Sequence, residues 1–91
     1  MQVSKQDFRM EIATDPNPDT DYWWHVYVKA YVTLHIPVDN VHIIQRIESP
    51  GLYGVEEYMT PECDKYHQEI YRDECATLEK MLVGIGVSVV D

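Results

Sequence analysis

The clearest pattern in the chain is a strict alternation of apolar and polar side chains from residue 24 to residue 36. Alternation with a period of two is typical of a strand that buries one face and exposes the other. We therefore expect a strand with one core face and one face turned to water or to a partner. The core set is Trp24, Val26, Val28, Ala30, Val32, Leu34 and Ile36, and the outward set is His25, Tyr27, Lys29, Tyr31, Thr33 and His35.

A shorter alternation over residues 7–13 predicts an earlier strand whose core side would carry Phe8, Met10 and Ile12. The stretch 14–21 follows, with two prolines, one asparagine and three aspartates. Because such residues favour turns and offer nothing to bury, we interpret this stretch as a loop.

Residues 37–40 supply turn residues, and residues 41–48 are again rich in β-branched side chains, which predicts a hairpin. A four-residue loop would pair Ile36 with Val41. Continuing this register pairs Leu34 with Ile43, Val32 with Gln45 and Ala30 with Ile47 inside, and His35 with His42, Thr33 with Ile44, Tyr31 with Arg46 and Lys29 with Glu48 outside. The opposite charges of the last pair support the register, since a slip of one residue would bury the polar set. Gln45 is the inward residue that fits poorly.

The C-terminal third of the chain predicts one long helix. Residues 52–58 are interpreted as a loop with at most one short strand. Thr60 is the expected N-cap, Pro61 and Glu62 suit the first turn, and the helix should end near residue 82 or 83, before two glycines. Residues 87–90 would pair at a sheet edge or pack as a tail. The apolar stripe of the helix is Cys63, Tyr66 or His67, Ile70, Tyr71, Cys75, Leu78, Met81 and Leu82.

These elements predict a single α+β domain over residues 1–91, built as an antiparallel sheet of three or four strands with one long C-terminal helix packed on its apolar face. The first ten residues hold no apolar run suited to a signal peptide, and no stretch is long enough for a membrane span. We therefore expect a cytoplasmic protein. Cys63 and Cys75, about 18 Å apart along the helix, should be free thiols.

The candidate chemistry is sparse. His35 and His42 should lie within reach of each other on the outward face, but zinc needs three or four protein ligands, so we expect no metal site and no cofactor. The sequence around Cys63 does not offer the base and orienter that a Cys/His catalyst requires, so a structural role as a small apolar side chain is favoured for it. The chain holds no phosphate-binding glycine loop and no nucleophile elbow. We predict that the protein is not an enzyme.

Charge is the more informative property, since sixteen acidic residues stand against seven Lys and Arg, for a net charge of -9. This balance disfavours direct binding to nucleic acid or to an anionic membrane. Residues 47–64 hold five acids and no Lys or Arg, and Asp15, Asp19 and Asp21 add a second acidic group. Aromatic residues are interleaved with both groups, and two tyrosines lie on the outward strand face. An acidic surface with aromatic anchors suits a basic groove on a partner protein, although acidity also serves solubility alone. The expected partner-binding residues are Tyr53, Glu56, Glu57, Tyr58, Glu62, Asp64, Tyr27 and Tyr31.

The stretch RIESPGLYGVEEY, followed by a helix that contains ECATLEKMLVGIGV, resembles a class of small acidic proteins of phages and mobile elements. In that class an ES-x-GL-[WY]-G-[IV]-E segment precedes a helix with a Leu-rich end. The resemblance covers about residues 46–86, and it departs from the pattern at residues 57–60, where a run of Asp and Ser is replaced. It implies a phage setting, in which small acidic proteins often bind and block a host enzyme.

The expected function is therefore a stoichiometric inhibitor of a host nuclease or defence complex, of the anti-CRISPR or another anti-defence type. The alternative is a homodimeric structural or virion accessory protein that pairs through the outward tyrosines Tyr27 and Tyr31.

Overall fold

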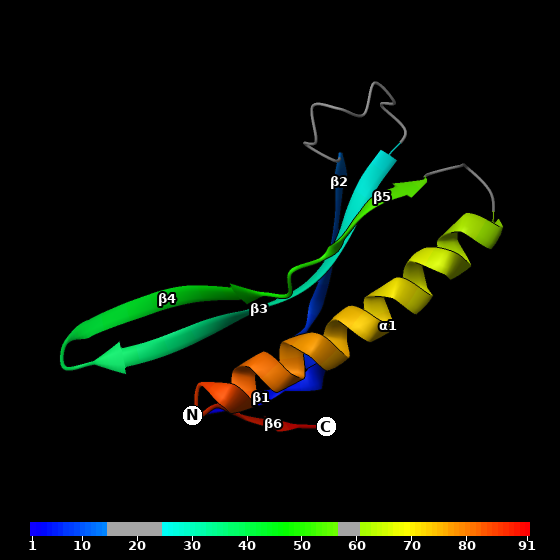
Figure 1. Cartoon of the computed structure of the whole chain (residues 1–91). Coiled ribbons are helices and arrows are strands. Elements are labelled where there is room, and N and C mark those ends of the chain that lie inside the picture. Colours follow the sequence, from blue (N-terminus) through cyan, green and yellow to red (C-terminus); the bar gives the residue numbers. More distant parts are fainter. Residues whose placement is uncertain (15–24, 57–60) are drawn as a thin grey trace.

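The computed structural model describes residues 1–14, 25–56 and 61–91, apart from the side chains of Glu56 and Pro61. It has an α+β fold, with a four-stranded antiparallel sheet and one long C-terminal helix packed against one face of the sheet (Figure 1). The sheet strands are β2 (Arg9–Thr14), β3 (His25–Val38), β4 (Val41–Glu48) and β5 (Leu52–Glu56), and the helix is α1 (Pro61–Gly84). A second, two-stranded sheet pairs β1 (Gln2–Ser4) in parallel with β6 (Ser88–Val90), and the 3-10 turn η1 (Lys5–Asp7) follows β1. The predicted fold class is confirmed.

The central element is β3, because every other strand of the large sheet pairs with it. β2 pairs along one side of β3, as far as Tyr31. β4 and β5 follow one another along the other side, with β4 opposite residues 31–38 and β5 opposite residues 25–28. The segment predicted as a loop with at most one short strand thus contains β5, and the predicted tail residues pair with the N-terminal β1 instead of the sheet edge.

The alternation along β3 places its apolar residues against α1, as expected. At one end of the helix, Leu78 and Leu82 are fully buried against the middle of β3, together with Phe8 and Val87. At the other end, Ile70 packs on a cluster of strand valines, Val26, Val28 and Val55. Each fully buried aliphatic side chain stabilises the fold by about 1.5–3 kcal/mol, so these two clusters hold the helix against β3. Trp24, the first residue of the predicted core set, lies outside the described residues.

The helix settles one open alternative, since His67 is buried and Tyr66 is exposed. Met81, predicted in the apolar stripe, is instead partly exposed. The helix begins at Pro61 and extends to Gly84, close to the predicted bounds. The predicted N-cap Thr60 lies outside the described residues.

The predicted hairpin register is wrong by two residues. β3 continues through Pro37 to Val38, which pairs with Val41, so the loop contains only Asp39 and Asn40. Asp39 takes a positive φ of 54°, as the tight turns of two-residue hairpins require. A shift of two residues leaves every side chain on its predicted face. Gln45 now lies opposite Leu34 and is exposed to solvent.

Candidate functional site

The face of the sheet that α1 leaves uncovered, here called the outer face, carries a network of aromatic and charged side chains. Its members come from four strands and are Glu11, Tyr27, Lys29, Tyr31, Arg46, Glu48 and Tyr53. The predicted outward positions of Tyr27 and Tyr31 are confirmed. Neither tyrosine is a bare aromatic surface, because each is engaged by other members of the network.

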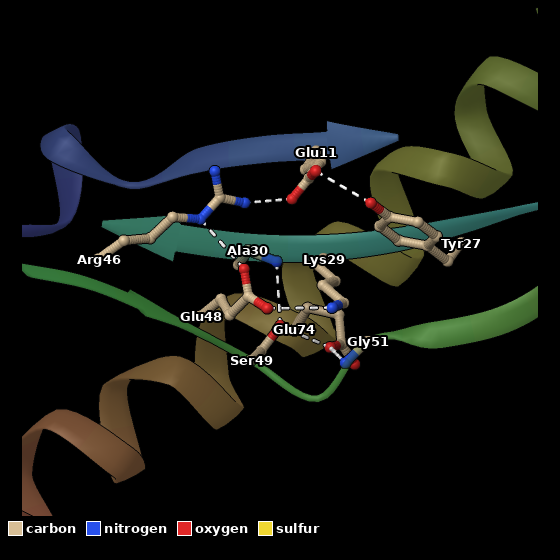
Figure 2. A network of polar contacts seen from close by, with 9 residues as sticks. All are labelled: Glu11, Tyr27, Lys29, Ala30, Arg46, Glu48, Ser49, Gly51 and Glu74. Carbon is tan, nitrogen blue, oxygen red and sulfur yellow. Dashed lines mark hydrogen bonds and ion pairs between the residues drawn. The ribbon is translucent and has the colours of Figure 1, made fainter. Parts of the chain in front are cut away.

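Two basic side chains organise this network (Figure 2). Arg46 forms ion pairs with Glu11 and with Glu48, the latter at 3.0 Å, and its guanidinium lies 3.8 Å from the centre of the Tyr31 ring. Lys29 pairs with Glu48 at 3.1 Å. These neighbours hold the pKa of Glu48 below its usual value, chiefly through the Lys29 hydrogen bond. The pairs predicted between Tyr31 and Arg46 and between Lys29 and Glu48 therefore form, as diagonal contacts across the corrected register.

The aromatic members surround Lys29. Its ammonium lies 5.0 Å from the centre of the Tyr27 ring and 5.6 Å from that of Tyr53, and the two rings are 5.1 Å apart. The Tyr27 hydroxyl donates a hydrogen bond of 2.9 Å to Glu11, which raises the pKa of Tyr27. Two carboxylates and two basic side chains thus neutralise one another at the centre of the outer face.

A second set of polar contacts joins β3 and the β4–β5 connection to α1 (Figure 2). The Glu74 carboxylate on α1 accepts hydrogen bonds from the Ser49 hydroxyl at 2.6 Å and from the Gly51 backbone N–H at 2.7 Å. The buried Ser49 hydroxyl also accepts from the Ala30 N–H at 3.0 Å, and the Ser49 N–H donates to the Ala30 carbonyl. This group fixes the break between β4 and β5. No short sequence motif signals it, since its members are 19 to 25 residues apart.

Of the predicted acidic residues, Glu62 and Asp64 lie on α1, apart from the outer face. Glu62 and Asp64 are exposed in the first turn of α1. The backbone of Glu56 ends β5, whereas its side chain, Glu57 and Tyr58 lie outside the described residues. Sequence reasoning missed the residues that continue the acidic surface along the helix.

Three acids and one tyrosine recur on α1 at intervals of three or four residues, the spacing of one helix face. We call this surface the acidic helix face: Glu62, Tyr66, Glu69 and Asp73, all exposed. Within the described part of the chain none of its acids forms an ion pair, although Lys65 and Arg72 are exposed on the same helix. The spacing of these four residues is visible in the sequence, but the sequence left open whether Tyr66 or His67 faces the core. The structure buries His67, and Tyr66 is exposed.

Two contacts involve groups that catalyse reactions in other proteins. His35 Nδ1 and His42 Nε2 are 3.3 Å apart on the exposed face, as predicted, and among the described residues no group of three metal-ligating side chains occurs. The prediction that Cys63 has neither base nor orienter is wrong for the base, because α1 places His67 Nε2 3.6 Å from its sulfur. Both residues are buried, so the pair faces the protein interior. The two cysteines are free, as expected.

A hollow of about 310 Å³ lies between α1 and the N-terminal turn. Its rim holds Lys5, which pairs with Glu79 and Asp91, and its wall holds Tyr71 and Cys75. Burial raises the pKa of Tyr71 to about 12 and also raises that of the Cys75 thiol. The charged lining residues are Lys5, Arg72 and Glu79, and Lys5 and Glu79 already pair with each other.

Comparison of the chain with models of protein families, with curated proteins and with solved structures finds no match in any of the three. Within the described residues, no helix is both long and apolar enough to cross a membrane. The functional interpretation therefore rests on the chain's own surfaces.

Proposed function

We propose that this protein is a stoichiometric binding protein that places its acidic helix face in a basic groove of a host nuclease or defence complex. The protein would act without catalysis, in the cytoplasm of the host cell, as an anti-CRISPR or another anti-defence inhibitor. The observation that carries the proposal is the separation of charge between the two sides of the molecule.

This separation follows from where the basic side chains are used. On the outer face, Lys29 and Arg46 are neutralised by Glu11 and Glu48. On α1, the three acids of the acidic helix face form no ion pair within the described residues. The outer-face network is thus formally neutral, whereas α1 carries six acids against Lys65, Arg72 and Lys80, and an excess of one charge sign steers a partner of the opposite sign.

The composition of the acidic helix face also suits a protein partner. Tyr66 lies between Glu62 and Glu69, and tyrosine is among the side chains that anchor interfaces. From Glu62 to Asp73 the acids extend over about 16 Å of helix, at about 1.5 Å per residue. A row of carboxylates of this length can occupy a groove built for nucleic acid phosphates.

The choice of a host defence enzyme as the partner rests on the resemblance of residues 46–86 to small acidic phage proteins. The resemblance assigns no catalytic residue. The Cys63–His67 pair is buried in the protein interior, the His35–His42 pair is exposed, and among the described residues no group of three metal-ligating side chains occurs.

The proposal is tested by an affinity pull-down with the purified protein from bacterial lysates that contain a panel of defence nucleases, washed at about 0.1 M and then about 1 M salt. We expect a nuclease that is retained in the first wash and released in the second, and whose DNA cleavage the protein inhibits at a 1:1 ratio. Retention of no nuclease, or retention without inhibition, would contradict the proposal.

Two charge-reversed variants sharpen the test. Glu69→Lys with Asp73→Lys reverses two acids of the acidic helix face, and we expect at least a tenfold loss of affinity for the captured nuclease. Asp7→Lys with Asp91→Lys makes the same change in net charge on exposed residues away from α1 and should leave the affinity within about twofold. Equal losses in both variants would show that total charge matters and the acidic helix face does not.

A further inference from the structure

The outer half of the β3–β4 hairpin extends beyond the rest of the sheet (Figure 1). β2 pairs with β3 only as far as Tyr31, so residues 32–38 and 41–47 form a two-stranded arm with no third strand among the described residues. The base of the arm packs on the core through Val32, Leu34 and Ile47. A two-stranded hairpin is marginally stable by itself. The end of the arm nearest the turn, here called the tip, would therefore be stabilised by pairing with a further strand.

The tip is apolar on both faces. Ile43 and Val41 lie on the face that continues the core, and Ile44 lies on the outer face. Val41 is 62% exposed and Ile44 is 67% exposed. Exposed aliphatic residues on both sides of an edge strand are rare in monomeric proteins and typical of strands that pair with another chain.

The hydrogen-bonding pattern shows which edge of the arm is open. The Ser49 N–H donates to the Ala30 carbonyl, so the odd-numbered residues of β4 direct their backbone groups toward β3. The even-numbered residues His42, Ile44 and Arg46 therefore direct theirs away from the sheet. The edge of β3 that faces away from β4 is interrupted by Pro37, which has no N–H to donate, whereas β4 contains no proline and no lysine. The free edge of β4 is thus the accessible one.

The shape of the molecule is consistent with an arm that projects from the sheet. The radius of gyration is 15.3 Å, whereas a compact chain of this length has about 12 Å. The chain exposes 6418 Å², and a monomer of its mass is expected to expose about 5500 Å². The molecule is therefore more extended than a compact monomer of its length.

We propose that a second copy of this chain pairs with the free edge of β4, so that the two β4 strands run antiparallel about a twofold axis at Ile44. In this register Ile44 meets its own copy, and His42 lies opposite Arg46 of the other copy. On the core-side face, Ile43 meets Gln45 and Val41 meets Ile47. No two like charges lie opposite each other, so the strand is complementary to itself, as a twofold interface requires.

Charge favours a second copy at this place. The whole chain carries -9, but residues 32–47 contain one acid, Asp39, and one base, Arg46, and are formally neutral. Two acidic molecules therefore meet where they repel each other least. Because added salt screens the remaining repulsion, the dimer should become tighter as salt rises. This inference is independent of the proposed function, since no residue of the acidic helix face takes part.

Sedimentation equilibrium from about 1 to 300 µM tests the proposal, and we expect a mass that rises toward twice 10.7 kDa. Ile44→Lys places two positive charges at the twofold axis and should weaken the dimer at least tenfold. The matched control is Ile85→Lys, at an aliphatic residue that is 62% exposed at the end of α1, which should dimerise as the wild type does. Because both sites are exposed, both variants should keep the wild-type circular dichroism and, at concentrations where the wild type is monomeric, its unfolding midpoint.

A cysteine pair tests the register. Hydrogen-bonded antiparallel residues have Cα atoms about 5.5 Å apart, which suits a disulfide. Ile44→Cys should therefore give a covalent dimer on mild oxidation, whereas Val41→Cys, opposite Ile47 of the other copy, should not exceed the wild-type background. A protein that stays monomeric at 300 µM, a dimer that survives Ile44→Lys, or a dimer broken only by Tyr27→Ser and Tyr31→Ser would overturn the proposal.

Discussion

The buried hydroxyl of Ser49 provides a stringent test of how the helix and the sheet are joined. Ser49 is 1% exposed, accepts a hydrogen bond from the Ala30 N–H and donates one to the Glu74 carboxylate. Ser49→Ala removes both hydrogen bonds with the smallest possible change in volume. Ala30 is fully buried, so water cannot replace the acceptor that its N–H loses.

The expected cost is the sum of two unequal parts. A buried N–H left without an acceptor costs about 1–3 kcal/mol. The lost hydrogen bond to Glu74 adds about 1 kcal/mol, the value of an ordinary hydrogen bond, because this carboxylate is only partly buried and water reaches it. We therefore expect Ser49→Ala to lower the free energy of unfolding by about 2–4 kcal/mol, a large part of the roughly 5–15 kcal/mol of a small domain.

Urea unfolding followed by circular dichroism measures this cost. With a slope of about 1 kcal/mol per molar urea, the midpoint should fall by about 2–4 M. The control is Ser88→Ala, which removes an exposed hydroxyl and should cost less than about 0.5 kcal/mol. A loss for Ser49→Ala no larger than for Ser88→Ala would refute the reasoning. A double-mutant cycle with Glu74→Ala should also give a coupling energy of about 0.5–3 kcal/mol, and strict additivity would show that the two side chains act separately.

Three further predictions concern stability. Gly51→Ala places a Cβ 2.6 Å from Lys29 Cγ at a φ of +88°. We expect it to lower the free energy of unfolding by more than about 1 kcal/mol, so the urea midpoint should fall by more than about 1 M. The control Gly84→Ala meets open space at the helix end and should not destabilise the protein. The pKa of Glu48 is lowered from 4.5, chiefly by Lys29, so folded Glu48 stays ionised where unfolded Glu48 binds a proton. Stability should therefore fall as the pH drops below about 4.5, and a Glu48→Gln variant with an equally steep fall would contradict this. Burial raises the pKa of Tyr71 to about 12, so stability should decrease as the pH rises from about 10 toward 12, and Tyr71→Phe should remove the last tyrosine transition in ultraviolet absorbance.

Among the candidate binding residues, the sequence placed Tyr27 and Tyr31 correctly on the outward face but could not show what they contact. The ion pairs of Arg46 with Glu11 and Glu48 join strands from distant parts of the chain. Such contacts depend on strand order, which alternation does not encode. The sequence therefore identified a surface rich in tyrosine but could not show that its charges cancel there.

The sequence by itself determined the elements and their faces, because periods of 2 and of about 3.6 residues are properties of local backbone geometry. It could not determine the hairpin register. Side-chain faces repeat every two residues, so the alternation excludes a register shift by one residue but does not distinguish registers that differ by two. The register follows from the two-residue turn, in which Asp39 takes a positive φ, and from an open strand edge where Pro37 needs no hydrogen-bond partner for its nitrogen. The phase of α1, which buries His67 and exposes Tyr66, likewise required the sheet, because only packing against a surface selects which of two adjacent residues faces inward.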